Sequence, residues 1–258
     1  MFRVIAMLLM SLSCLLLTAA CSQAQVPGAQ GNLIEVSVVD RNTGASLPLL
    51  RGAGDVWVEG RPGQRYAIRL TNRSGARLLA VLSVDGINAV TGQTASPEQG
   101  GYVLGPYEST DITGWRKSLS QVAAFEFAAL GDSYAARTGR PDNVGVLGVA
   151  VFRERPIPPR KVVALEERTR QLHDAADAGI APPAPASAPR QAIGTAHGQR
   201  EYSEVATTQF ERASLRPDEV LSVRYDNREN LIALGVLPGT WPDSRRPAPF
   251  PMGFVPDP

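Results

Sequence analysis

Short runs of apolar residues, many of them alternating with polar ones, fill the chain from residue 33 to residue 154. In the clearest run, residues 65–72, Tyr66, Ile68 and Leu70 share one face, and polar or small side chains occupy the other. This period of two is typical of a β-strand with one face toward the core. Similar runs occur at residues 33–39, 55–59, 78–84, 87–90, 102–104, 110–113, 122–127 and 144–152.

Turn-forming residues separate these runs and set the fold class. Asp85-Gly86 is a strong signal for a tight hairpin, with residues 87–90 as the returning arm. No long segment with a period of 3.6 residues interrupts the strands, which argues against alternating helices around a parallel sheet. The pattern predicts a mainly β fold, an antiparallel β-sandwich or jelly-roll-like domain over residues 33–155.

A helix and a proline-rich linker are expected next, over residues 156–193. Residues 160–178 carry a thin apolar stripe and end before a glycine, which predicts one linker helix. Four prolines follow within residues 180–189. Such a composition favours an extended, solvated connection.

Residues 194–237 read as a small C-terminal β-hairpin unit. An alternating run at 219–225, a polar turn at 226–230 and an apolar run at 231–237 form the two arms. About 45 residues bury little surface alone, so we expect this unit to complete or cover the first sheet. The tail, residues 238–258, holds 7 prolines in 21 residues and predicts either a disordered end or a docking segment.

The first 21 residues have the order of a secretory signal. Arg3 precedes an apolar run from residue 4 to residue 17, and Ala19 and Ala20 stand before Cys21. The apolar run is shorter than the ~20 residues that a permanent membrane-spanning helix needs. Cleavage before Cys21 is therefore expected, and it would remove the other cysteine of the chain.

This ending resembles the lipobox of bacterial lipoproteins, with threonine where leucine is usual at residue 18. The resemblance implies a signal peptide at residues 1–20, lipidation of Cys21 and, since serine rather than aspartate follows, export to the outer membrane. Residues 21–32 are small and polar and read as a lipidated tether. The alternative is an ordinary secreted protein that is cut after Ala20.

Charge and composition exclude several classes of partner. The chain has 26 Lys+Arg against 25 Asp+Glu, a formal charge of +1. Such a balance creates no long-range positive potential that would attract nucleic acid. Two His and two Cys cannot build a four-ligand structural zinc site in the mature chain. The turn acids Asp85, Asp111, Asp132 and Asp142 are scattered, with no calcium-loop spacing. We expect no metal and no cofactor.

The segment Gly131-Asp132-Ser133 is the one candidate catalytic motif. It resembles the first block of the SGNH (GDSL-type) hydrolases, which implies that Ser133 attacks an ester carbonyl. The Asp-x-x-His and Gly-x-Asn-Asp blocks of that family have no counterpart here, and about 100 residues of predicted strands precede the serine. The other interpretation is that Ser133 caps a short helical turn.

Aromatic and basic side chains are the candidates for binding. Exposed aromatic residues on a sandwich bind glycans, although core packing is the simpler role for them. Arg65 and Arg69, with Arg73, share one face of a strand and form a positive stripe for lipid headgroups or an anionic glycan, unless acids balance them. The aromatic candidates are Trp57, Tyr102, Tyr107 and Trp115.

These observations favour a non-enzymatic outer-membrane lipoprotein that acts as a structural or binding module. Its partners would be the membrane, through the lipid anchor, and an envelope protein or a glycan. Residues 114–118 and 133–144 resemble stretches of uncharacterised proteobacterial envelope proteins, which carry no assigned activity. The alternatives are an envelope esterase that uses Ser133 and a glycan-binding module.

Overall fold

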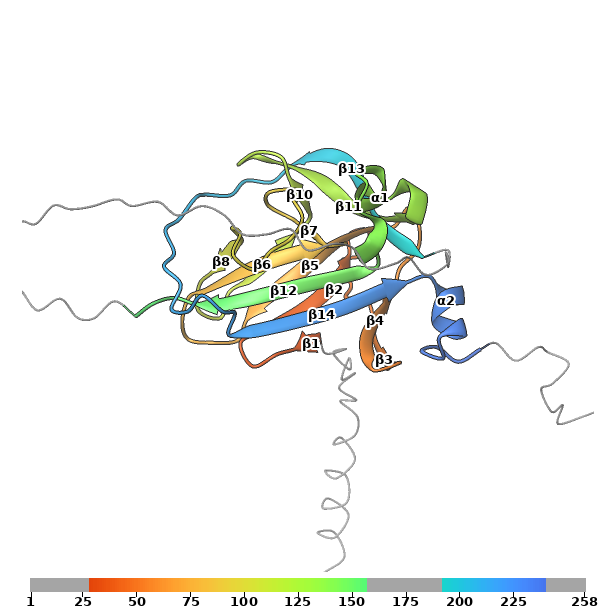
Figure 1. Ribbon diagram of the computed structural model, residues 1–258, viewed down its shortest axis with the longest axis horizontal. Coiled ribbons are helices and arrows are strands. Elements are labelled where there is room, and N and C mark those ends of the chain that lie inside the picture. Colours follow the sequence, from red (N-terminus) through yellow and green to blue (C-terminus); the bar gives the residue numbers. More distant parts are fainter. Residues whose placement is uncertain (1–27, 157–191, 240–258) are drawn as a thin grey trace, which may run out of the picture.

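Two seven-stranded sheets pack against each other in the computed structural model, which describes residues 28–156 and 192–239 (Figure 1). The predicted mainly β, sandwich-type fold is confirmed. Apart from β4 and β14, which run parallel, all paired strands are antiparallel. Sheet A contains β1 (Ala29–Gln30), β2 (Ile34–Asp40), β5 (Arg65–Asn72), β9 (Ser109–Ile112), β10 (Gly114–Arg116), β11 (Gln121–Ala129) and β13 (Ile193–Tyr202).

Sheet B is built from strands that lie far apart in the sequence. Its order is β3-β4-β14-β12-β6-β7, and β8 also pairs with β6. Within the described residues there are also four short helical segments: η1 (Leu130–Asp132), α1 (Tyr134–Arg137), η2 (Pro141–Asn143) and α2 (Arg228–Ala233). The strands are β3 (Leu49–Gly52), β4 (Asp55–Glu59), β6 (Leu78–Val84), β7 (Ile87–Asn88), β8 (Tyr102–Leu104), β12 (Val146–Arg153) and β14 (Glu219–Asp226).

The inward faces of both sheets form one apolar core. In β5 the predicted alternation places Tyr66, Ile68 and Leu70 in this core, each without exposed surface. Leu82 and Val149 meet them from sheet B, also almost fully buried. The period-2 pattern thus identified the core-facing side of the strands correctly, because a strand sends alternate side chains to opposite faces.

The predicted hairpin at Asp85-Gly86 is confirmed. Val84 pairs with Ile87 across the turn, and both turn residues have positive φ, 52° for Asp85 and 72° for Gly86. A two-residue turn of this type requires the left-handed region at both positions. Glycine adopts it freely, whereas Asp85 does so at some cost, which its side-chain contacts offset.

The predicted C-terminal hairpin is wrong in its second arm. β14 forms as expected, but residues 231–237 do not return as a strand, because helix α2 begins after Asn227. The Asn227 side chain accepts a hydrogen bond from the Asn230 backbone N–H (2.8 Å), the standard cap of a helix start. β14 instead lies between β4 and β12 in the interior of sheet B, so it completes that sheet (Figure 1).

The expected tether also ends earlier than the composition indicated. Ala29 and Gln30 form β1, which pairs with β2, and Ala29 is almost fully buried. The sequence pattern also missed the ten-residue strand β13 and the short strands β3 and β10. Cys21 and the signal segment lie outside the described residues, as do the predicted helix at 160–178, the linker at 180–189 and most of the tail.

A buried polar network joins the two sheets at one end of the core. The Thr195 hydroxyl of β13 bonds to the Tyr66 hydroxyl of β5 (2.6 Å) and to the Tyr225 hydroxyl of β14 (2.7 Å). The Tyr225 hydroxyl also donates to the Asp85 carboxylate, which accepts the backbone N–H groups of Thr195 (2.7 Å) and Gly145 (2.9 Å). Sheet A, sheet B and the β6–β7 turn therefore share one set of hydrogen bonds.

Candidate functional site

Ser133, the candidate nucleophile, is a helix cap in this structure. It has no exposed surface, and its hydroxyl donates to the Leu130 carbonyl (2.7 Å) and accepts from the Ala136 backbone N–H (3.1 Å). The hydroxyl proton is thus bound by η1, and one lone pair is used to cap the start of α1. His197, the histidine of the described residues, makes no hydrogen bond to Ser133; its ring packs on Tyr134 instead. The geometry gives Ser133 a structural role.

Trp57 and Trp115, proposed for glycan binding, do not form an exposed platform. Trp115 is 2% exposed and packs edge-on against Phe125, with ring centroids 5.2 Å apart. Trp57 is 9% exposed, and its indole N–H donates to the Gly52 carbonyl (2.9 Å). Both rings belong to the interior, which was the simpler interpretation of the sequence.

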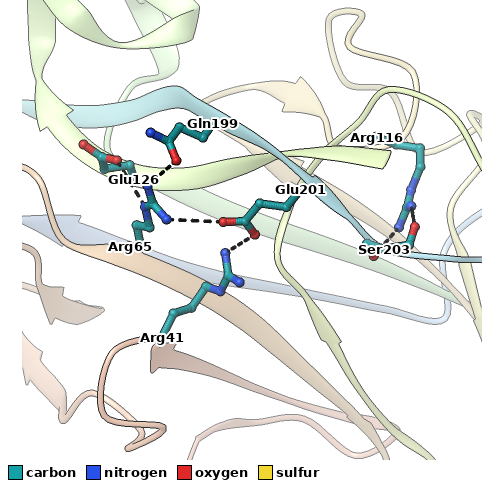
Figure 2. Close-up of polar contacts among 7 residues, drawn as sticks. All are labelled: Arg41, Arg65, Arg116, Glu126, Gln199, Glu201 and Ser203. Atoms are coloured by element: carbon teal, nitrogen blue, oxygen red, sulfur yellow. Dashed lines mark hydrogen bonds and ion pairs between the residues drawn. The ribbon is translucent and has the colours of Figure 1, made fainter. Parts of the chain in front are cut away.

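Arg65 and Arg69 lie on the outer face of sheet A, where acids and amides neutralise them. Arg69 holds the Asp111 carboxylate through two hydrogen bonds of 2.7 and 2.8 Å. Arg65 lies between Glu126 and Glu201, at 3.8 and 3.4 Å (Figure 2). The arrangement matches a solvated sheet face balanced by carboxylates, which is the alternative to a positive stripe.

The turn acids do not converge. Asp85 is in the core network, Asp111 is paired with Arg69, and Asp132 and Asp142 are exposed. Within residues 28–156 and 192–239, no group of three or more His, Cys, Asp or Glu side chains could hold a metal ion.

A cleft of about 540 Å³ lies beside two buried polar atoms that have no hydrogen bond within the described chain, the Tyr102 hydroxyl and the Arg116 Nε. β8 forms one wall, and an extended segment, Ser203–Gln209, forms the other; we refer to this segment as the strap. The volume of the cleft lies in the range of sites for small ligands. The cleft is lined by Val90, Gly101, Tyr102, Val103, Leu104, Glu108, Thr110, Arg116, Leu119, Glu204, Val205, Ala206, Thr207 and Thr208.

Two arginines hold the strap at its ends. Arg116, at the end of β10, donates to the Ser203 carbonyl (2.6 Å), and Figure 2 shows its guanidinium directed at that residue. At the other end, Arg77 donates to the Thr208 hydroxyl and the Gln209 carbonyl, both at 3.2 Å. The strap is thereby fixed beside the cleft by charge-assisted hydrogen bonds at both ends.

Two buried polar atoms at the cleft have no well-formed hydrogen bond within the described chain. The Tyr102 hydroxyl and the Arg116 Nε are both inaccessible to solvent, and neither makes a hydrogen bond of acceptable geometry. Burial raises the pKa of Tyr102, and the charge of the nearby Arg116 and a hydrogen-bonding interaction with its side chain oppose that rise. A buried donor without an acceptor costs about 1–3 kcal/mol, so the pair is suited to receive an oxygen atom from outside the chain.

The rest of the cleft is mainly apolar. Val103, Leu104, Leu119 and Val205 contribute aliphatic surface. One of the two acids, Glu108, is occupied by local bonds: it accepts from the Gly105 backbone N–H (2.6 Å) and the Thr110 hydroxyl (3.0 Å). The lining therefore combines aliphatic walls with one cation, Arg116, the Tyr102 hydroxyl and two carboxylates, Glu108 and Glu204, and a mixture of apolar walls and a few polar groups is typical of a ligand site.

Sequence reasoning identified only part of this site. Tyr102 was among the candidate aromatic residues, but Arg116 and the strap gave no signal, since the strap has neither a strand pattern nor a motif. Comparisons with known proteins returned no match to any family model, curated protein or solved structure. None of the helices in the described part of the chain has the length and hydrophobicity needed to span a membrane.

Proposed function

We propose that this chain is a lipid-anchored protein of the bacterial outer membrane whose β-sandwich binds a small amphipathic anion without catalysis. Support for the anchor comes from the signal-like residues 1–20 and the lipobox cysteine, Cys21. Support for binding comes from the cleft between β8 and the strap. A protein or glycan partner stays a prediction from the sequence.

The single observation that carries the binding proposal is the unpaired donor pair, Tyr102 hydroxyl and Arg116 Nε. Arg116 can only donate, and the Tyr102 hydroxyl can both donate and accept; even if the guanidinium donated to the phenol oxygen, the phenol proton would still lack an acceptor. A carboxylate oxygen placed between them would accept both hydrogen bonds and meet the positive guanidinium, and charge-assisted bonds of this kind are the strong ones. The apolar walls then select a carboxylate that carries a hydrocarbon group.

The anchor is tested by replacing Cys21 with alanine. In a bacterium that processes lipoproteins, the wild-type chain should incorporate labelled palmitate and sediment with the membranes. Cys21→Ala should lose the label and appear in the soluble fraction, because a chain without acyl groups has no stable anchor. Labelling that persists in Cys21→Ala, or membrane association that does not change, would refute the lipidation site.

The binding is tested with two probes that share a hydrocarbon chain and differ in charge. Dodecanoate should bind the purified protein in isothermal titration calorimetry below its micelle concentration, and dodecyltrimethylammonium should bind at least about tenfold more weakly. Equal affinity for the two probes would show that the donor pair does not recognise the ligand.

Tyr102→Phe removes one donor and leaves the aromatic ring. It should weaken dodecanoate binding about tenfold, since one hydrogen bond to a charged group is lost. Tyr107→Phe is the matched control, because Tyr107 is 71% exposed and does not line the cleft. If both variants bind dodecanoate as the wild type does, the cleft is not the site.

A further inference from the structure

Four side chains that carry or can take up a positive charge gather at the end of the sandwich beside α1, away from the Tyr102 cleft. They are Lys117 after β10, Arg137 in α1, and His197 and Arg200 in β13. We name this group the cationic cluster. In Figure 1, α1 lies over the ends of β11 and β13, which brings the three segments together.

A β-bulge in β13 aims His197 and Arg200 at the same side. His197 lies opposite Phe125 and Arg200 lies opposite Ala123, so the two residues 198 and 199 face the single residue Ala124. Without this extra residue, side chains three positions apart would point to opposite faces of the sheet. Gly198 permits the bulge, since a Cβ there would lie 2.8 Å from the Ala124 carbonyl oxygen.

Aromatic rings form the floor under these charges. The Tyr134 ring lies 5.5 Å from the His197 ring and 5.1 Å from the Trp115 ring, measured between centroids. The Lys117 Nζ lies 5.7 Å from the centroid of Tyr134. A depression of about 320 Å³ opens here, lined by Tyr134, Arg137, Thr138 and His197.

The charges in this cluster have no counter-ion among the described residues. Lys117, Arg137 and Arg200 form no ion pair and no side-chain hydrogen bond within that part of the chain, although Arg41, Arg65, Arg69 and Arg77 are all paired with acids. These positive charges also act on His197. Burial and then the charge of Lys117 lower the pKa of His197, and Arg200 and Arg137 lower it further.

We propose that the cationic cluster binds a phosphate group. Arg137 lines the depression, and Lys117 and Arg200 add positive charge beside its Tyr134 and His197 rings. Together they match the double charge of a phosphomonoester, and guanidinium groups bind its oxygens in pairs. The Tyr134 and His197 rings offer an apolar face to the group that carries the phosphate, such as a sugar or a glycerol. This site is separate from the carboxylate cleft and does not depend on Tyr102 or Arg116.

The test follows phosphate binding through the His197 ring by NMR. Inorganic phosphate should raise the pKa of His197, because the bound anion offsets the surrounding positive charge. The double variant Arg137→Gln/Arg200→Gln should bind phosphate at least about tenfold more weakly. The matched control is Arg51→Gln/Arg216→Gln, which removes two exposed arginines that are also unpaired within the described chain.

Two further probes identify the source of the phosphate. Glycerol 3-phosphate represents a soluble ligand, and phosphatidylcholine vesicles containing phosphatidic acid represent a membrane headgroup. Binding of either probe that is lost in the cluster variant and kept in the control variant supports the proposal and names the source. An unchanged His197 pKa in phosphate, or equal binding by the cluster and control variants for every probe, overturns it.

Discussion

Replacing Asp85 with alanine should lower the free energy of unfolding by about 3–5 kcal/mol at pH 5. The Asp85 carboxylate accepts the buried backbone N–H groups of Thr195 (2.7 Å) and Gly145 (2.9 Å), together with the Tyr225 hydroxyl. Alanine leaves both N–H groups unpaired, at about 1–3 kcal/mol each.

Urea denaturation measures this effect, with the free energy of unfolding of Asp85→Ala compared with that of the control variant Asp142→Ala. Asp142 is exposed in η2, so the same substitution there should change the free energy of unfolding by less than about 0.5 kcal/mol. A loss below about 1 kcal/mol for Asp85→Ala would mean that the buried network does not hold the two sheets together.

Asp85 should also make the stability of the protein fall as the pH rises from about 4 to about 6. Burial raises the pKa of Asp85 from 3.8 to about 6, although the hydrogen bonds from Tyr225, Thr195 and Gly145 act in the opposite direction. Because the folded state keeps its proton at a pH where the unfolded chain has lost it, the folded state binds more protons in this window. Its free energy of unfolding therefore decreases, by about 3 kcal/mol in total, and the contribution of Asp85 is constant above pH 7.

The pH effect is isolated by comparing the wild type with Asp85→Asn in urea at pH 4, 5, 6 and 7. Asparagine cannot ionise, so the stability advantage of the wild type should be largest at pH 4 and should shrink toward pH 7. Asp40 and Glu98, whose pKa values are lowered by hydrogen bonds, change stability in the opposite sense. Both residues are present in the wild type and in Asp85→Asn, so their effects cancel in the difference between the two proteins. A difference that does not vary with pH would contradict the raised pKa of Asp85.

Local patterns predicted most strands between residues 33 and 155, because the period of two follows directly from strand geometry, but they missed the longest strand, β13. Residues 55–59 and 65–72 have the bounds of β4 and β5, and the Asp85-Gly86 turn joins β6 and β7 as expected. The strand prediction was wrong where a strand pattern and a helix signal occur in the same segment. Residues 231–237 are apolar enough for a strand, but the cap formed by Asn227 and the burial of Leu231 favour the helix α2.

Pairing between distant strands could not be predicted from the sequence. β14 joins β4 in parallel, with Arg224 opposite Trp57, and nothing in either strand identifies the other as its partner. β10 escaped notice because three residues are too few to show a period. Such elements depend on the tertiary contacts that surround them rather than on their own propensity.

The candidate sites were harder to predict than the fold, because their residues meet only after folding. Tyr102 could be singled out as an aromatic residue, yet its lack of a hydrogen-bond partner depends on the strap, whose Ser203 is held by Arg116. The cationic cluster likewise depends on the bulge at Gly198, which moves Arg200 to the side of His197. No residue pattern in a single sequence encodes these two arrangements.

The central claim is that the Tyr102 hydroxyl is reserved for a ligand, and its most direct test is the stability of Tyr102→Phe without ligand. If the hydroxyl has no partner in the chain, removing it relieves an unpaired buried donor and should leave the free energy of unfolding unchanged or raise it by about 1–2 kcal/mol. Tyr107→Phe, at an exposed position, should stay within about 0.5 kcal/mol of the wild type. A loss of 1 kcal/mol or more in Tyr102→Phe, on the order expected for a broken internal hydrogen bond, would contradict the account.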